Sequence, residues 1–146
     1  MIGEKRMPDI ILVSGGFDPI HSGHIKLIND ANKYGDVVVL LNSDEWLRNK
    51  KGKEFLSFDE RKIIMQNIKG VVDVLDFDDS DKSCVDGIMK AKKLFQNNII
   101  KFANGGDRNN KTTPEKEFCD KNNIETLFGI GGNNKSNSSS WILKKW

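Results

Sequence analysis

The only two histidines of this 146-residue chain lie three positions apart, in the stretch SGGFDPIHSGH at residues 14–24. An apolar run precedes this stretch and a helical pattern follows it, so His21 and His24 should share one face of the first turn of a helix. Gly15 and Gly16 allow the backbone to approach a ligand closely. Free amides at a helix N-terminus attract anions, and two imidazoles beside them can stabilise charge on a phosphate. The stretch therefore predicts a phosphate site.

Two other interpretations fit the histidine pair when it is taken alone. The rings could form a solvated surface pair, or they could be half of a zinc site to which a carboxylate such as Asp18 adds a ligand. Zinc needs a third ligand, and no cysteine or further histidine is near in the sequence. The glycine pair and the position between a strand and a helix favour phosphate chemistry over both.

A second glycine-containing loop follows a later apolar run, at Ala103–Arg108. Gly105 and Gly106 again permit close approach of the backbone to a ligand. Asp107 could hydrogen-bond a base or a ribose, or hold a metal ion, and Arg108 could contact a phosphate through two donors. An ordinary turn also fits this loop, because Asn, Gly and Asp are common turn residues.

Two further segments could bind an anionic ligand. Serines 138–140 lie in the Gly/Asn/Ser-rich segment Gly129–Ser140, at the start of a predicted short helix at Ser138–Trp146. They could cap that helix or donate to a polyphosphate, although such a run is often only a linker. The basic run Arg48–Lys53 follows a strand and a short helical turn. Such a run is usually a solvated surface, but this one could overhang the site and hold an anionic substrate.

The elements that must position these loops follow from hydrophobic pattern. Five short, nearly continuous apolar runs predict strands covered on both faces. These are Asp9–Ser14, Asp36–Asn42, Val71–Phe77, Asn98–Ala103 and Ile124–Phe128. Helices are predicted at Ser22–Tyr34 with Gly35 as a cap, at Ser57–Ile68 behind a capping box, along the stripe Val85–Phe95, and after Thr113-Pro114.

Strands that alternate with helices indicate an α/β fold with a parallel sheet, in which ligands bind at the carboxyl ends of the strands. Residues 1–146 contain neither an internal repeat nor an inter-domain linker, so a single domain is expected. The formal net charge of +2 gives no strong field that would favour nucleic acid or a membrane. No secretory signal or spanning segment is recognised, and two cysteines without a metal or disulfide pattern fit a cytoplasmic protein.

The sequence also resembles a known family. Residues 15–24, GGFDPIHSGH, resemble the G-x-F-D-x-x-H-x-G-H signature of the cytidylyltransferase-like nucleotidyltransferases. Asn42-Ser43-Asp44 and Gly105-Gly106-Asp107 resemble the heptose-1-phosphate adenylyltransferases of that family. Glu60-Arg61-Lys62 resembles its glycerol-3-phosphate cytidylyltransferases, and the serine run before Trp141 resembles the helix start that closes the family's triphosphate site.

This resemblance implies a Rossmann-like sheet of five parallel strands in the order 3-2-1-4-5, with helices on both faces. It implies an enzyme that transfers AMP or CMP from ATP or CTP to a phosphorylated sugar or polyol. Pyrophosphate is released, Mg²⁺ assists, and no covalent enzyme intermediate forms. It also leads us to expect a homodimer.

The resemblance implies roles for individual residues. His21 and His24 would stabilise the α/β-phosphate region in the transition state, with Lys50 as a third catalytic residue. The acceptor phosphate would be bound by Lys50, Lys53 and Arg61. The nucleotide site would comprise Gly15, Gly16, Phe17, Asp18, Gly105, Gly106, Asp107, Arg108, Ser138, Ser139 and Ser140.

Two positions depart from the family pattern. Position 16 is often a hydroxyl residue in the family, and here it is glycine. Asn133–Ser136 replaces the Arg-Thr-x-Gly that cytidylyltransferases tend to carry, and Lys135 could replace that arginine only as a point charge. The missing arginine, together with the Gly105-Gly106-Asp107 loop, favours ATP slightly over CTP. The two departures, at Gly16 and at Asn133–Ser136, keep open an alternative, a nucleotide-binding regulatory module that has no catalytic activity.

Overall fold

The computed structural model describes residues 7–105 and 113–131, which form one five-stranded sheet and its helices. All strand pairs are parallel, and the order across the sheet is β3-β2-β1-β4-β5. The elements in chain order are β1 Ile10–Gly15, α1 Ser22–Asn32, β2 Asp36–Leu41, α2 Asp44–Lys51, α3 Phe58–Gln66, β3 Val71–Leu75, α4 Val85–Leu94, β4 Ile100–Gly105, α5 Pro114–Lys121 and β5 Glu125–Ile130. The predicted fold class is confirmed.

The central strands send alternate side chains into two separate cores. Leu12 of β1 packs with Val38 and Leu40 of β2 on the face that α4 and α5 cover. Ile11 and Val13 of β1 belong to the core on the opposite face, beneath α1 and α3. All five side chains are completely buried. Because both faces are covered, nearly every strand position must be apolar, which explains the continuous apolar runs in the sequence.

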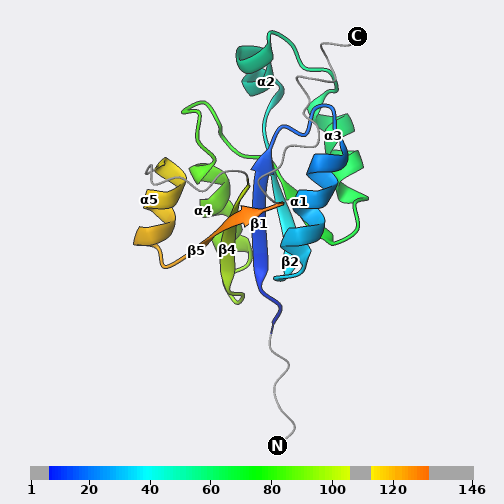
Figure 1. The fold of residues 1–146 in the computed structure, drawn as a ribbon. Coiled ribbons are helices and arrows are strands. Elements are labelled where there is room, and N and C mark those ends of the chain that lie inside the picture. Colours follow the sequence, from blue (N-terminus) through cyan, green and yellow to red (C-terminus); the bar gives the residue numbers. More distant parts are fainter. Residues whose placement is uncertain (1–6, 106–112, 132–146) are drawn as a thin grey trace, which may run out of the picture.

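Four of the described helices form two layers, one on each side of the sheet, and α2 belongs to neither layer. Figure 1 shows α1 and α3 on one side of the sheet and α4 and α5 on the other. The short helix α2 stands beyond the sheet, at the end where the strands terminate. The order of strands reverses beside β1, because β2 lies on one side of it and β4 on the other. Open α/β sheets bind ligands at such a switch point.

Several element boundaries differ from those that the sequence predicted. The first four residues of the basic run, Arg48–Lys51, lie within α2 instead of following a short helical turn, and Lys53 lies beyond the helix. Helix α1 ends at Asn32 with Lys33 as its C-cap, so Gly35 does not cap it. Gly35 is a glycine for another reason, since a Cβ there would collide with the carbonyl oxygen of Asp9. The helix predicted at residues 138–146 lies outside the described residues.

Most of the predicted helix starts are confirmed. The Ser57 hydroxyl accepts from the Glu60 amide at 3.3 Å, and the Thr113 hydroxyl accepts from the Lys116 amide at 3.1 Å.

Within residues 7–105 and 113–131, no helix has the length and apolar character that crossing a bilayer requires. The longest of these helices, α1, has 11 residues.

Candidate active site

The loop between β1 and α1 lies at the carboxyl end of the central strand. His21 is the N-cap of α1, in an extended conformation, and His24 is the third residue of the helix. The Gly23 amide donates to His21 Nδ1 at 3.0 Å, and the His21 amide donates to His24 Nδ1 at 3.3 Å. The two imidazoles therefore form a reciprocal capping box, in positions usually taken by Ser or Thr and by Glu or Gln.

These hydrogen bonds fix which ring nitrogens can donate. Each Nδ1 atom uses its lone pair to accept an amide proton, so in the neutral ring the proton lies on Nε2. The rings are stacked, with centroids 3.8 Å apart and an interplanar angle of 26°. The edge-to-face contact of His24 with the buried Phe17 ring, at 4.8 Å, further fixes this arrangement. The two histidines lie on one face of the helix start, as the sequence predicted. The pair can thus present two Nε2–H donors from neighbouring positions.

His24 is neutral at physiological pH. Its pKa is lowered from 6.5 to about 3, mainly by burial, and the nearby His21 and Lys51 side chains contribute in the same direction. A neutral imidazole at this position is an oriented hydrogen-bond donor and not a fixed positive charge. The positive charge of the site comes instead from lysines and from the amides at the start of α1.

The backbone of the loop turns sharply beneath the histidines. Phe17 has a φ of 49°, in the left-handed region that non-glycine residues rarely adopt. Gly16 is in close contact with α2, since a Cβ at this position would lie 2.7 Å from Leu47 Cδ2 and 3.5 Å from Trp46 Cζ3. The space that the family's hydroxyl side chain would need at position 16 is therefore filled from α2. This gives a physical reason for the glycine.

Asp18 fastens the loop between β1 and α1 to a neighbouring segment of the chain. Its carboxylate is 1% exposed and accepts from the Phe55 amide at 2.6 Å and from the Leu56 amide at 2.8 Å. Both carboxylate oxygens are thus used to fasten the loop to the segment that connects α2 and α3. The nucleotide-binding role that the sequence suggested for Asp18 stays a prediction.

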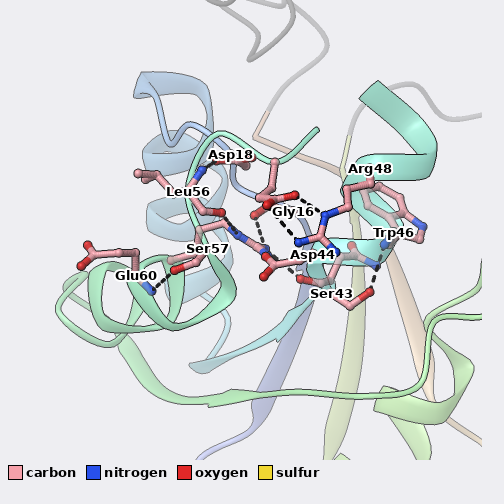
Figure 2. A network of polar contacts seen from close by, with 12 residues as sticks. Gly16, Asp18, Ser43, Asp44, Trp46, Arg48, Leu56, Ser57 and Glu60 are labelled. Atoms are coloured by element: carbon pink, nitrogen blue, oxygen red, sulfur yellow. Dashed lines mark hydrogen bonds and ion pairs between the residues drawn. The ribbon is translucent and has the colours of Figure 1, made fainter. Parts of the chain in front are cut away.

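Arg61 is the buried centre of this anchor. Its Nη1 atom donates to the carbonyl oxygens of Gly16 at 3.0 Å and Asn42 at 2.7 Å. Its Nη2 atom pairs with Asp44 at 2.7 Å, and its Nε atom donates to the Leu56 carbonyl at 3.0 Å. Figure 2 shows Gly16, Asp44 and Leu56 gathered around this network. The side chain is 0% exposed, so in this conformation it holds three loops together and does not contact a ligand directly. The acceptor-binding role expected for Arg61 stays a prediction.

The lysines of α2 are arranged differently from what the sequence suggested. Lys51, which the sequence analysis did not single out, donates from Nζ to the Asp18 carbonyl at 2.8 Å. Burial is the main cause that lowers its pKa. Lys50 places Nζ 4.6 Å from the centroid of the Trp46 ring, a cation–π contact, and Lys53 is exposed beyond the helix. Only long-range contacts distinguish Lys51 from its neighbours, so its role could not be found in the local pattern.

A second residue that sequence reasoning missed is Asp79, in the loop between β3 and α4. Its carboxylate accepts from the Asn42 side chain at 3.0 Å, and from the Ser43 amide and hydroxyl, each at 2.8 Å. Asp79 is buried, and so is Asn42. The loops after β2 and β3 are thereby joined at the carboxyl edge of the sheet.

Several predicted site residues lie outside the described residues, namely Gly106, Asp107, Arg108, Ser138, Ser139 and Ser140. Gly105 ends β4 and pairs with Ile130 of β5. Lys26 of α1 donates to the Gly131 carbonyl at 2.9 Å, which ties the end of β5 to the helix that carries the histidines. The ends of β4, β5 and the helix that carries the histidines are thereby linked to one another.

The zinc interpretation gains no support from the part of the chain that the structure describes. There, no group of three or more His, Cys, Asp or Glu side chains could hold a metal ion. Cys84 and Cys119 are buried free thiols, and burial raises their pKa values to about 12 and about 11.

Comparison with known proteins identifies the family of this fold. The model of the cytidylyltransferase-like family matches residues 12–132. The chain therefore belongs to the cytidylyltransferase-like family. Within that family it is an enzyme of the nucleotidyltransferase type.

Individual relatives differ in length and in name. A glycerol-3-phosphate cytidylyltransferase of Bacillus subtilis is 31% identical over 121 residues, which cover 82% of this chain and 88% of that protein. A bifunctional protein HldE of Helicobacter hepaticus is 26% identical over 140 residues, which cover 94% of this chain but only 27% of that protein. A lipopolysaccharide core biosynthesis protein of Thermoplasma volcanium superposes with a TM-score of 0.63 at 20% identity, over 83% of this chain and 93% of the other. That last likeness concerns the fold.

Proposed function

We propose that this enzyme transfers AMP or CMP from ATP or CTP to a small phosphorylated sugar or polyol, with release of pyrophosphate. The observation that carries the proposal is the stacked histidine pair at the start of α1, which presents two Nε2–H donors at the switch point of the sheet. Donors of this kind lower the energy of a transition state in which charge builds up on phosphate oxygens.

The proposed reaction is an in-line displacement at phosphorus. A phosphate oxygen of the acceptor forms a bond to the α-phosphorus, and the bond from that phosphorus to the bridging oxygen of the β-phosphate breaks. The electron pair leaves with pyrophosphate. His21 and His24 would donate to oxygens of the α/β region, and the amides of Gly16 and Phe17 would add further donors. Lys50 and Lys51 would hold the acceptor phosphate, so catalysis consists of positioning and charge stabilisation.

We further propose that Mg²⁺ takes part and enters with the nucleotide. Mg²⁺ commonly keeps several waters and binds through substrate phosphates with one or two carboxylates, so a dedicated protein cage is not required. Asp107 is the carboxylate that the sequence offers for this role, and it lies outside the described residues. The ion would neutralise charge on the leaving pyrophosphate.

The choice of nucleotide and acceptor rests on resemblance. Gly105-Gly106-Asp107 and the lack of arginine at Asn133–Ser136 favour ATP slightly, while the relation to a glycerol-3-phosphate cytidylyltransferase keeps CTP close. A pyrophosphate-release screen tests the proposal directly. It would combine ATP and CTP with sugar phosphates, glycerol 3-phosphate and phosphopantetheine. We expect release that needs Mg²⁺, one nucleotide and one acceptor together, and an inactive panel would contradict the proposal.

Two substitutions of His21 separate its chemical role from its role as a helix cap. His21→Ala removes both the Nε2–H donor and the cap, whereas His21→Asn removes the donor and keeps a side chain that caps well. Both variants should lose about 100-fold or more in rate, on the scale of one transition-state donor. Only His21→Ala should lose stability, by about 1 kcal/mol in urea unfolding. Full activity of His21→Asn would show that the donor is not needed.

A second candidate function is a nucleotide-binding module without catalysis. The observation that favours it is Gly16, where the contact with Leu47 leaves no room for a hydroxyl side chain at the phosphate. Tight binding of ATP or CTP by calorimetry, without turnover across the acceptor panel, would support this alternative.

We also propose a cytoplasmic homodimer as the working form of the enzyme. Its support is the resemblance to the family. Light scattering coupled to size exclusion measures the molar mass, and a value near 16.5 kDa, the mass of one chain, would contradict the dimer.

A further inference from the structure

Asp79 is a buried carboxylate whose three hydrogen bonds all run to another loop. It is 7% exposed, and it accepts from the side chain of Asn42 and from the amide and hydroxyl of Ser43. A carboxylate removed from water is costly unless donors surround it, and here three donors at 2.8–3.0 Å do so. Asp81, a carboxylate of the same loop, differs in burial and in partners. It is exposed, and among the described residues it accepts from the amide and hydroxyl of Ser83 within its own loop.

The bonds of Asp79 end at the first turn of α2. Ser43 is the N-cap of this helix, and its hydroxyl accepts from the Trp46 amide at 3.0 Å. The single hydroxyl proton of Ser43 is donated to Asp79 Oδ1, so Asp79 sets the orientation in which the hydroxyl can cap the helix. Figure 2 shows Ser43 and Trp46 at this helix start, close to Gly16.

Helix α2 carries two lysines close to the histidine loop or to its neighbouring aromatic ring. Lys51, at its last position, reaches the Asp18 carbonyl at 2.8 Å, and Lys50 lies over Trp46. The direction of an eight-residue helix is set by its first turn, so a rotation at Ser43 would move both lysines.

The histidine loop itself has separate supports. The Asn42 amide donates to the Gly15 carbonyl at 3.0 Å, and Arg61 holds the Gly16 carbonyl. The Asp18 carboxylate is held by the Phe55 and Leu56 amides. Asp79 binds the side chain of Asn42, whereas the loop is held by the Asn42 backbone, Arg61 and Asp18, so loss of Asp79 should affect α2 first.

We propose that Asp79 is a positioning residue for the acceptor, because it fixes the start of α2 so that Lys50 and Lys51 meet the acceptor phosphate. This inference rests on the proposed function. The three bonds of the Asp79 carboxylate run to Asn42 and Ser43 and not to the histidine loop or the two lysines, so Asp79 acts through Ser43.

Steady-state kinetics of three variants test the inference. Asp79→Ala removes all three acceptor interactions, Asp79→Asn keeps the shape and one carbonyl oxygen, and Asp81→Asn is the matched control on the same loop. For Asp79→Ala we expect the acceptor KM to rise about tenfold or more, on the scale of a displaced positioning group. The nucleotide KM should change by less than about twofold. Asp79→Asn should show a smaller rise, and Asp81→Asn should resemble the wild type. A merely structural role predicts instead a smaller active fraction, which lowers kcat and leaves both KM values unchanged, and that result would overturn the inference.

A measurement without turnover keeps this inference separate from the proposed function. Reductive ¹³C-methylation labels the lysine side chains, and Lys51→Arg identifies the NMR signal of Lys51. In the wild type and in Asp81→Asn the Lys51 signal should titrate below the ordinary lysine range, as expected for a half-buried ammonium. In Asp79→Asn and Asp79→Ala it should return toward that range. If the wild type releases no pyrophosphate with any substrate pair, the proposed function fails. The Lys51 signal then still tests whether Asp79 positions α2. An unchanged Lys51 signal in both Asp79 variants overturns the inference.

Discussion

Each histidine in the loop after β1 has two different nitrogens with two different tasks. Nδ1 accepts an amide proton of the helix start, and Nε2 carries the proton that can be donated to a ligand. Protonation of Nδ1 would remove the acceptor and break the cap. The neutral state of His24 is therefore required by the local backbone as well as favoured by burial.

We predict that the His24 ring does not titrate between about pH 5 and pH 8. Its pKa is lowered to about 3 because burial disfavours the charged ring, and because His21 and Lys51 lie nearby. The chain has only two histidines, so an NMR titration of the ring Cε1–Hε1 groups gives two signals, which His21→Asn assigns. A midpoint near 6.5 for His24 would contradict the prediction.

The same shift makes stability depend on pH. An unfolded histidine takes up its proton near pH 6.5, whereas folded His24 does so near pH 3. Between these values the unfolded chain binds more protons, so the free energy of unfolding falls as the pH falls from about 6.5 toward 3. His24→Gln removes this group and keeps a side chain suited to a capping box. Urea unfolding at about pH 7 and pH 5 should therefore show a smaller loss for His24→Gln than for the wild type.

Gly16 and Leu47 form a matched pair of positions. We predict that Gly16→Ser destabilises the protein by about 1–3 kcal/mol, because its Cβ would lie 2.7 Å from Leu47 Cδ2. In a Leu47→Ala background the same serine should cost much less, since the colliding methyl group is gone. A double-mutant cycle in urea measures this coupling, and additive effects would contradict it.

The histidine loop could be singled out from the sequence because its signal is local. Two glycines, an N-cap position and a spacing of three between histidines occur within one short stretch. Arg61 and Lys51 could not be understood in the same way. Their bonds to Gly16 and Asp18 cross 45 and 33 positions, and nothing in the local pattern distinguishes them from surface cations.

At the scale of elements, α2 is the helix that the sequence pattern underestimated. Its residues are mostly charged or polar, and Leu47 is its only buried side chain. A hydrophobic stripe is the main sequence signal for a helix, and here the stripe is missing because α2 lies beyond the sheet and covers no core. The helix is held by polar contacts at its start, through Asp79 on one side and Arg61 on the other.

Arg61 and Arg48 provide a matched comparison of buried and exposed ion pairs. We predict that Arg61→Met destabilises the protein by about 3–5 kcal/mol, because the carboxylate of Asp44 and three carbonyl oxygens lose a buried donor. Arg48→Met removes an equally short pair with Glu54, at 2.7 Å, but on the surface, and it should change stability little. Urea unfolding of both variants checks this, and equal losses would be the contrary result.

At the scale of the whole molecule, strand order and layering were the most predictable features. Five apolar runs that alternate with helices leave few topologies once crossovers are right-handed, and the family resemblance selects the order 3-2-1-4-5. The limits of two strands differ from the prediction. β4 and β5 each extend two residues beyond the predicted limits, to Gly105 and Ile130, because strand pairing and not apolar character determines where they end.

The two cysteines belong to the core that α4 and α5 cover. We predict that neither reacts with a thiol reagent such as dithionitrobenzoate in the native protein, and that both react in urea. Burial raises the pKa of Cys84 to about 12 and that of Cys119 to about 11, so neither is a thiolate at neutral pH. Rapid labelling of one thiol without unfolding would contradict the prediction.

The reciprocal capping by His21 and His24 has a consequence for protein design. A designer who transplanted only the glycine loop would leave out both imidazoles and the helix-start amides that orient them. A designer who transplanted only the helix would bring the two rings without the glycine loop that precedes them. The smallest portable unit therefore runs from Gly15 to Ile25, and it must be grafted onto the end of a parallel strand in one piece. The host would also need a buried cation in the place of Arg61, so that the carbonyl oxygen of Gly16 keeps its donor.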